Sequence, residues 1–146
     1  MTWLYEQSEF SLPEDANPKD LYGFVYLIEN TANGRKYVGK KFFWKSKVLP
    51  ITKTRKRRQR LKVESDWKEY YGSSEELSAD VTKFGVESFK RTILHLCATK
   101  GECAYLEAKE QFDREVLLSE DYYNSWIAIK VRKNHISRLH LTKTML

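Results

Sequence analysis

Two apolar runs joined by a tight turn constrain the fold of this chain more than any other feature. Residues 24–28 and residues 35–39 are both typical of β-strands, and Asn33–Gly34 between them supplies the positive φ angles that a tight hairpin requires. Side chains alternate between the faces of a strand, and in the first run both faces are apolar. One face carries Phe24, Tyr26 and Ile28, and the other carries Val25 and Leu27. The hairpin is therefore predicted to be central to a sheet that is covered on both sides.

Helices and a third strand follow the hairpin. A short helix is predicted from Ser65 to Gly72, and a Ser-x-x-Glu capping box at Ser73–Glu76 predicts the start of a second helix, which Gly85 ends. Residues 89–97 are predicted to form the third strand, and a longer helix is expected over 102–118. This order predicts an α+β domain with a small, mostly antiparallel three-stranded sheet flanked by helices.

The long helix is predicted to be amphipathic. Its apolar face is expected to carry Ala104, Tyr105, Ala108 and Phe112, and its opposite face Glu107, Glu110 and Arg114.

The chain of 146 residues has room for one domain with short extensions. Residues 1–20 are predicted to be a loosely structured N-terminal arm, because their prolines are incompatible with regular helix or strand. Residues 21–126 are expected to form the domain, with a basic insertion at about 45–63 that becomes ordered on binding. Residues 127–146 are expected to form a late edge strand or an extended tail.

Composition favours a folded protein of a reducing compartment. The chain is 41% hydrophobic and 14% aromatic, and no apolar run approaches the roughly 18 residues that a membrane span needs. The N-terminus lacks the basic start and following apolar run of a secretory signal, so none is expected. Cys97 and Cys103 are too few for a disulfide framework, and both are expected to be buried. A cytoplasmic location is therefore expected.

Positive charge is concentrated in one segment. The net charge is +6, and the window 53–62 holds seven basic residues and no acidic one. These residues are Lys53, Arg55, Lys56, Arg57, Arg58, Arg60 and Lys62. Like charges at this density repel one another and favour a polyanion, and arginine suits phosphate. Nucleic acid is the favoured partner; an acidic protein, a membrane surface, a localisation peptide and a solvated loop stay open.

Several stretches together resemble the GIY-YIG nuclease superfamily. Residues 23–26 (Gly-Phe-Val-Tyr) and 36–40 (Lys-Tyr-Val-Gly-Lys) resemble its paired motif, although the first stretch has one inserted residue. The run 73–94 resembles its second helix and third strand, 107–112 its metal-ligand helix, and 122–124 its terminal asparagine element. The resemblance implies the corresponding fold over residues 22–124.

The resemblance also implies a reaction, namely hydrolysis of a DNA phosphodiester with one divalent ion, Mg²⁺ or Mn²⁺. Glu110 would be the only protein ligand, since Mg²⁺ keeps most of its waters. Tyr26 or Tyr37 would activate or position the attacking water, and Lys40 would supply the positive charge that a phenolate at neutral pH needs. Asn124 would orient a tyrosine or the strand ends through hydrogen bonds.

Structural interpretations of the same residues remain open. Tyr26 and Tyr37 could form an ordinary cross-strand aromatic pair. Glu107 and Glu110 cannot be distinguished by spacing alone, and Glu110 is preferred because it directly precedes Gln-Phe, as in the family motif. Either glutamate could equally be a solvated helix residue.

One departure from the family pattern concerns a cation. The family carries an arginine on its first helix, whereas the matching position here is Asp66. The missing charge is expected from Lys68, Lys47 or the arginines of 55–60, and Lys68 is added to the predicted nucleic-acid-binding set. We therefore predict a Mg²⁺-dependent DNA endonuclease, with a catalytically inactive nucleic-acid-binding protein as the alternative. Any sequence specificity must come from the basic segment, the arm, the tail or a homodimer partner.

Overall fold

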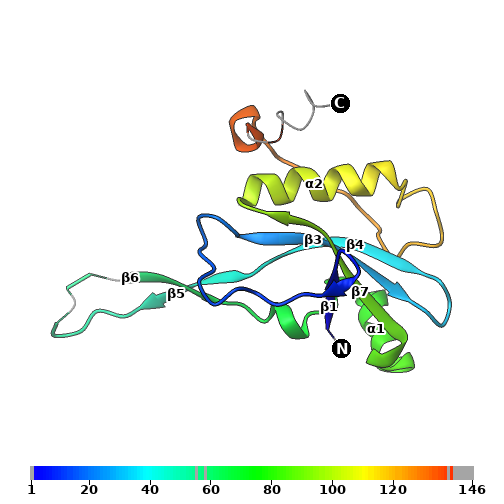
Figure 1. Ribbon diagram of the computed structural model, residues 1–146, viewed down its shortest axis with the longest axis horizontal. Helices are drawn as coiled ribbons and strands as arrows, with labels where there is room; N and C mark the ends of the chain where they lie inside the picture. The colour runs from blue at the N-terminus through cyan, green and yellow to red at the C-terminus, as the bar shows by residue number, and fades with distance from the viewer. Residues whose placement is uncertain (1, 55, 58, 138, 140–146) are drawn as a thin grey trace.

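A five-stranded sheet forms the centre of the molecule (Figure 1). The computed structural model describes residues 2–54, 56–57, 59–137 and 139. The strand order is β2-β1-β7-β3-β4, with β3 antiparallel to both β4 and β7 and β1 parallel to β7. The strands are β1 (Trp3–Tyr5), β2 (Ser8–Glu9), β3 (Gly23–Asn30), β4 (Lys36–Phe42) and β7 (Phe89–Cys97).

This sheet is larger than the predicted three-stranded one because N-terminal residues join it. Trp3 pairs in register with Arg91 of β7, and its indole N–H donates to the carbonyl of Trp67 at 2.8 Å. The Trp3 ring is buried, and its edge packs against Phe24. Burying a large aromatic side chain stabilises this added edge. The prediction of a loosely structured arm over 1–20 therefore does not hold for residues 3–9.

Helices α1 (Glu75–Phe84) and α2 (Lys100–Asp113) cover opposite faces of the sheet (Figure 1). The predicted alternation along β3 is confirmed. Its first apolar set packs in one core cluster with Leu77 of α1, and its second set packs in another with Cys103 of α2. Strand β3 is central as predicted, whereas β4 is an outer strand.

Local details differ at the helix ends. Helix α1 begins after Ser74, whose hydroxyl accepts from the Leu77 N–H, so the predicted cap at Ser73 is one residue early. The predicted helix over 65–72 is a single 3₁₀ turn, η1 (Trp67–Glu69). Thr99 caps α2, and the helix ends well before 118. Two further 3₁₀ turns are η2 (Val86–Ser88) and η3 (Lys133–Ile136).

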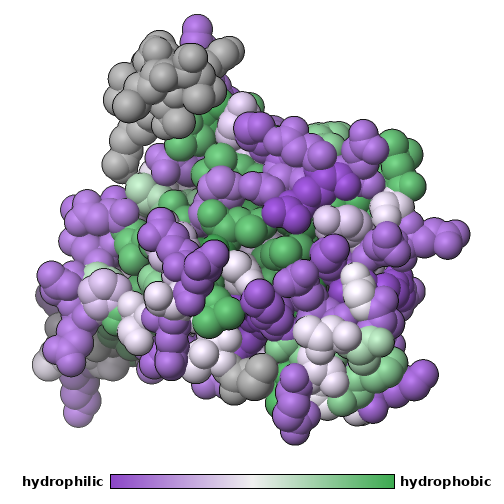
Figure 2. Space-filling model, turned by 45° about the vertical axis from the view of Figure 1, so that its right-hand side comes forward, coloured by the Kyte–Doolittle hydropathy of each residue, from purple (hydrophilic) through white to green (hydrophobic). Residues whose placement is uncertain are grey.

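The buried face of α2 matches the predicted one only in part. Ala108 is buried as predicted, but Phe112 is 60% exposed. Cys103 and Gln111 are also buried, and Glu107 lies on the same stripe. Polar groups are thus brought against β4. Figure 2 shows one face of the molecule, on which hydrophilic side chains surround smaller apolar patches.

The basic segment is a two-stranded hairpin and not the predicted loop. Strands β5 (Trp44–Leu49) and β6 (Gln59–Glu64) pair antiparallel and project from the body (Figure 1). At its base, the Trp44 indole N–H donates to the Leu21 carbonyl at 2.8 Å. Ser65 closes the other side by donating its hydroxyl to the Phe42 carbonyl at 2.6 Å. We call residues 44–64 the basic ribbon.

The chain after α2 returns along β4. Residues 124–132 form neither helix nor strand, which agrees with an extended tail and not with a late edge strand. The rest of the predicted C-terminal segment includes residues outside the described ranges. Within the described part of the chain, no helix is long and apolar enough to cross a membrane.

Candidate active site

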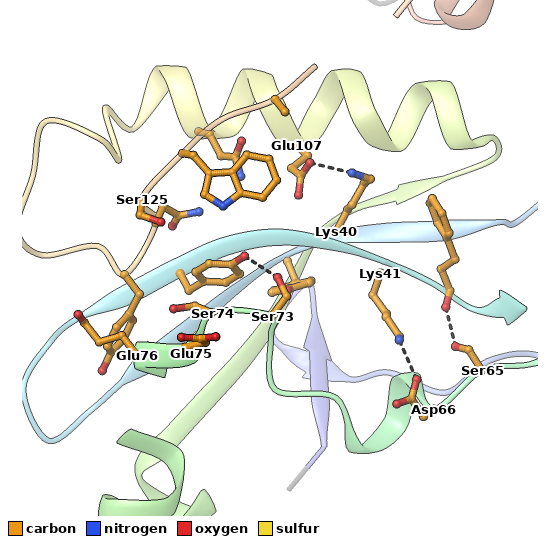
Figure 3. A pocket seen from close by; sticks show the side chains of 18 of the residues that line it. Lys40, Lys41, Ser65, Asp66, Ser73, Ser74, Glu75, Glu76, Glu107 and Ser125 are labelled. Atoms are coloured by element: carbon orange, nitrogen blue, oxygen red, sulfur yellow. Dashed lines mark hydrogen bonds and ion pairs between the residues drawn. The ribbon is translucent and has the colours of Figure 1, made fainter. Parts of the chain in front are cut away.

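A cleft of about 1000 Å³ lies along the outer strand β4. No further strand follows β4 in the sheet order of the described residues. Backbone from the chain after α2 pairs with its beginning, where the Lys36 N–H donates to the Asp121 carbonyl at 2.8 Å and the Tyr123 N–H donates to the Lys36 carbonyl at 2.7 Å. Side chains from both faces of β4 therefore reach the same cleft (Figure 3). The cleft is lined by Tyr26, Tyr37, Lys40, Lys41, Phe42, Trp44, Lys45, Ser65, Asp66, Ser73, Ser74, Glu75, Glu76, Glu107, Gln111, Tyr123, Asn124, Ser125, Trp126 and Ala128.

The two predicted tyrosines meet on one face of β4. Their ring centroids are 6.2 Å apart, and the Tyr37 hydroxyl hydrogen-bonds the Ser73 hydroxyl at 2.9 Å just before α1 (Figure 3). Tyr26 pairs in register with Gly39, and a Cβ atom on Gly39 would collide with the Tyr26 hydroxyl. The glycine of the Tyr-Val-Gly motif therefore makes room for the phenol.

Burial keeps both phenols protonated at neutral pH. It raises the pKa of Tyr26 well above its ordinary value, and the neighbouring Tyr70 and Tyr37 raise that pKa further. Burial also raises the pKa of Tyr37, although the Ser73 hydroxyl opposes the shift. The expected phenolate beside Lys40 is not what this geometry provides, because Lys40 is paired with Glu107. The tyrosines are suited to hold a water by hydrogen bonding.

Glu107 enters the cleft from α2 on the other face of β4. Its carboxylate accepts a hydrogen bond from Lys40 Nζ at 3.1 Å, and its side chain is only 14% exposed (Figure 3). Burial raises the pKa of Glu107, while the Lys40 ammonium lowers it in part. Alternation along β4 places Lys40 on this face and Tyr37 on the opposite one.

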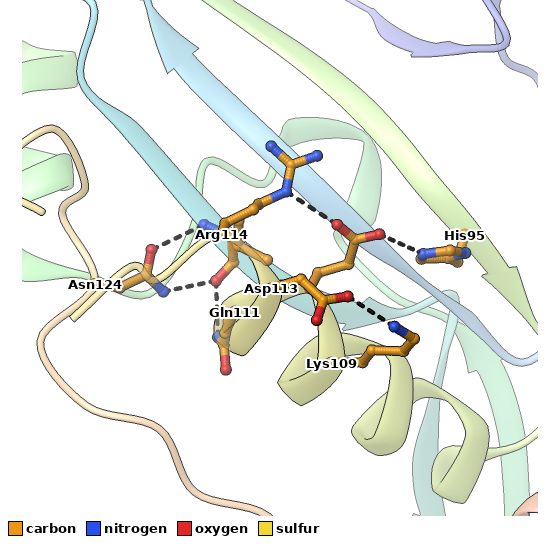
Figure 4. Close-up of polar contacts among 8 residues, drawn as sticks. His95, Lys109, Gln111, Asp113, Arg114 and Asn124 are labelled. Atoms are coloured by element: carbon orange, nitrogen blue, oxygen red, sulfur yellow. Dashed lines mark hydrogen bonds and ion pairs between the residues drawn. The ribbon is translucent and has the colours of Figure 1, made fainter. Parts of the chain in front are cut away.

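Asn124 and Gln111 hold the middle of β4 (Figure 4). The Asn124 side chain accepts from the Val38 N–H at 3.0 Å and donates to the Val38 carbonyl at 2.8 Å. Gln111 donates to the same carbonyl at 3.0 Å. These amides replace the hydrogen bonds that a further strand would make. Asn124 thus binds the strand between Tyr37 and Gly39.

Glu110, the predicted metal ligand, does not line the cleft. Its carboxylate contacts His95 Nε2 of β7 at 2.7 Å and Arg114 Nε at 2.9 Å (Figure 4). Burial raises the pKa of Glu110, but the hydrogen bonds from Arg114 and His95 outweigh it and lower that pKa overall. The sequence preference for Glu110 over Glu107 is therefore not supported, since the structure brings Glu107 to the tyrosines. In the sequence, the i, i+4, i+8 spacing of Cys103, Glu107 and Gln111 could have indicated that these three residues share the face of α2 turned toward β4.

The donor groups of the cleft fit one hard divalent ion. No group of three or more His, Cys, Asp or Glu side chains able to hold a metal is found among the described residues. Mg²⁺ commonly keeps several waters and binds one or two carboxylates together with substrate phosphates. Four carboxylates line the cleft, and Glu107 is the one that comes from α2. One such carboxylate together with substrate phosphates suits that mode, and a preformed cage is not required.

Lys40 lines the cleft as expected, but the other lysines that reach it are not those expected to replace the missing arginine. Lys41 pairs with Asp66 at 2.7 Å and lies 4.2 Å from the Tyr70 ring centre, and Lys45 also lines the cleft. Lys68 instead lies beside Glu64, and Lys47 is exposed on β5, outside the lining. The sequence analysis did not predict Lys41 and Lys45 as site residues, because it did not predict that β4 is the outer strand of the sheet beside which the cleft lies.

The basic ribbon presents charge on both faces. Its register places Lys47 opposite Leu61, and Arg60 opposite Val48 on the other face. Lys62 donates to the Tyr22 hydroxyl at 3.0 Å near the base. The remaining predicted basic residues lie at the far end, where Lys53, Lys56 and Arg57 are exposed. Arg55 and Arg58 lie outside the described residues.

Comparison with known proteins agrees with this arrangement. A family model described as "Putative endonuclease segE, GIY-YIG domain" matches residues 3–127, and the chain belongs to this family. The resemblance inferred from the sequence is thereby confirmed.

A curated relative is the "Putative endonuclease segE" of Enterobacteria phage T4. It is 30% identical over 105 residues, which cover 71% of this chain and 40% of the relative. The chain thus spans well under two thirds of the length of that protein. No solved structure matches the chain.

Proposed function

We propose that the chain hydrolyses phosphodiester bonds of DNA in the cleft along β4, as a Mg²⁺- or Mn²⁺-dependent endonuclease. The observation that carries this proposal is the meeting of Glu107 and Tyr37 in one cleft from opposite faces of a single strand. Family membership supports the same activity, because both the family description and its phage relative are named as endonucleases.

The reaction adds water across one P–O ester bond. The water oxygen bonds to phosphorus, the bond to one deoxyribose oxygen breaks, and that oxygen leaves as a hydroxyl after taking up a proton. The protonated phenols of Tyr26 and Tyr37 position the attacking water, and Asn124 keeps their strand in place. The Lys40 and Lys41 ammonium groups stabilise the negative charge that develops on the phosphate oxygens.

Glu107 is the residue that would hold the divalent ion. When bound, such an ion stabilises charge on the phosphate and on the leaving oxygen. Its positive charge also favours the ionised carboxylate against the effect of burial, which raises the Glu107 pKa.

The basic ribbon is proposed to hold the DNA backbone. Arginine and lysine on both faces and at the far end can contact phosphates on two sides of a groove, and a two-stranded ribbon fits the major groove of B-DNA. An isolated hairpin is only marginally stable in water. Binding is therefore expected to rigidify the ribbon.

A plasmid-nicking assay tests the proposal. Supercoiled plasmid is incubated with the protein in Mg²⁺, in Mn²⁺ and in EDTA, and DNA binding is measured in parallel. We expect relaxed and linear products only with a divalent ion. Binding without nicking under all conditions would contradict the proposed activity and favour the inactive DNA-binding alternative, which the endonuclease descriptions of its family do not favour.

A further inference from the structure

We propose that Trp126 stacks on an unpaired or extruded nucleobase beside the phosphate to be cleaved. This inference rests on the proposed nuclease function and specifies its substrate as DNA with a locally unpaired nucleotide. Trp126 is 71% exposed and lines the same cleft as Glu107 and Tyr37. This position places a large, exposed indole where a substrate bound in the cleft would contact it.

Other tryptophans of the chain have structural roles. Trp3 and Trp67 are buried in the core, and the indole N–H of Trp44 is bonded at the ribbon base. For Trp126, by contrast, no ring, hydrogen-bond or ion-pair contact of the indole is found within the described residues. Its ring is thus available to a ligand.

The backbone on either side of Trp126 is held in place. Asn124 is bound to Val38 through two hydrogen bonds, and the Tyr123 N–H donates to the Lys36 carbonyl at 2.7 Å. On the other side, Ile127 packs against the core cluster beneath α2. The backbone that carries the indole is therefore held beside the strand, which lowers the entropic cost of binding a ligand there.

The neighbouring charges favour a nucleobase as that ligand. The cleft lining holds three lysines (Lys40, Lys41, Lys45) and four carboxylates (Asp66, Glu75, Glu76, Glu107). The positive charge that suits a phosphate backbone comes from the adjoining basic ribbon, to which Lys45 belongs. Aromatic rings combined with a cationic groove are typical of sites for unpaired nucleic acid, because each base offers a ring face for stacking. A base within a duplex already stacks on both neighbours. Extruding it has a free-energy cost, which is smallest where pairing is already absent.

Fluorescence gives a direct readout of stacking. Trp126 is the most exposed of the tryptophans, so it dominates the fraction of emission that an ionic quencher such as iodide can reach. The protein in EDTA, which prevents cleavage, is titrated with a hairpin DNA duplex carrying one unpaired thymine and with its fully paired counterpart. We expect the unpaired substrate to protect Trp126 from iodide. Equal iodide quenching with and without the unpaired substrate would overturn the inference.

Affinity measurements with variants complete the test. Wild type and Trp126→Phe are expected to bind the unpaired substrate roughly 5- to 100-fold more tightly than the paired one, and Trp126→Ala is expected to lose this preference. Ile129→Ala, an exposed tail residue outside the cleft lining, serves as the control and keeps it. A preference that survives in Trp126→Ala, or its absence in wild type, refutes the stacking role.

A separate measurement shows whether the nuclease proposal itself fails. Nicking is measured with Mg²⁺ on the same two substrates. Stacking without nicking would refute the nuclease activity alone, and nicking without a Trp126-dependent preference would refute the stacking alone.

Discussion

Glu107 of α2 accepts a hydrogen bond from Lys40 Nζ of β4 at 3.1 Å, in a part of the cleft where only 14% of the glutamate side chain is exposed. The pair joins a helix to an outer strand whose opposite face carries Tyr37. Burial disfavours the carboxylate, and the Lys40 ammonium is the cation that counteracts burial. The charge state of Glu107 therefore depends on Lys40.

Replacing Lys40 with methionine should shift the pH dependence of cleavage. Loss of the ammonium raises the Glu107 pKa further, so the carboxylate ionises, and cleavage increases, only at higher pH than in wild type. Initial rates measured across the acidic to neutral range check this shift. Lys45→Met is the control, because Lys45 lines the cleft without acting on the Glu107 pKa. Superimposable profiles for Lys40→Met and wild type would contradict the prediction.

Gly39→Ala should displace the tyrosines. The new Cβ would collide with the Tyr26 hydroxyl and lie 2.9 Å from a Tyr37 ring carbon, and such overpacking destabilises by about 1–3 kcal/mol. We expect this loss in urea denaturation, together with loss of cleavage. Gly34→Ala provides the comparison: its φ of +76° imposes strain of about 1–2 kcal/mol, but the space around it is open, so cleavage persists. A Gly39→Ala protein with normal cleavage would contradict this account.

Asn124→Ala should loosen the outer strand. The Val38 N–H loses its acceptor, and an unsatisfied buried donor costs about 1–3 kcal/mol of the free energy of unfolding. Urea denaturation measures the loss, and faster exchange of the Val38 amide hydrogen locates it. Asn17→Ala removes only an exposed turn hydrogen bond and should change stability by less than about 0.5 kcal/mol. Equal stabilities for the two variants would disprove the role assigned to Asn124.

Neutralising the basic ribbon should weaken DNA binding and its salt dependence. The double variant Lys47→Gln, Arg60→Gln removes one charge from each face, and each lost phosphate contact lowers the slope of log K against log salt by about 0.9. Binding titrations at several salt concentrations measure this slope. Lys90→Gln with Lys109→Gln removes the same charge from exposed positions off the ribbon. A ribbon variant with the slope of that control would exclude the ribbon from DNA binding.

Local patterns predicted much of the fold. Alternating apolar residues around Asn33–Gly34 correctly predicted β3 and β4, and the strand 89–97 was located in full. The strand formed by Trp3–Tyr5 was not predicted, because three residues carry no periodicity and pair only with a distant partner in β7. The ribbon was predicted to be a loop because repulsion among its basic side chains was considered. The pairing of β5 with β6 could not be predicted from the sequence.

The site was predicted less completely. Tyr26, Tyr37, Lys40 and Asn124 do converge on one cleft, because adjacent strands and the returning tail bring them together. The choice between Glu107 and Glu110 depends on how α2 is rotated against β4. The predicted apolar face combined Ala108, which is buried, with Phe112, which is exposed, and so did not fix that rotation. Lys41 and Lys45 could be assigned to the cleft only after the structure showed β4 to be an outer strand.

A comparison of Glu107→Gln with Glu110→Gln tests the central claim most directly. Both substitutions remove one carboxylate charge from the same helix while keeping the size of the side chain, and plasmid nicking with Mg²⁺ or Mn²⁺ is measured alongside DNA binding. We predict that Glu107→Gln lowers the nicking rate by at least about 100-fold while DNA binding persists, and that Glu110→Gln cleaves at a rate close to wild type. Normal nicking by Glu107→Gln, or loss of nicking confined to Glu110→Gln, would contradict the assignment of the cleft as the active site.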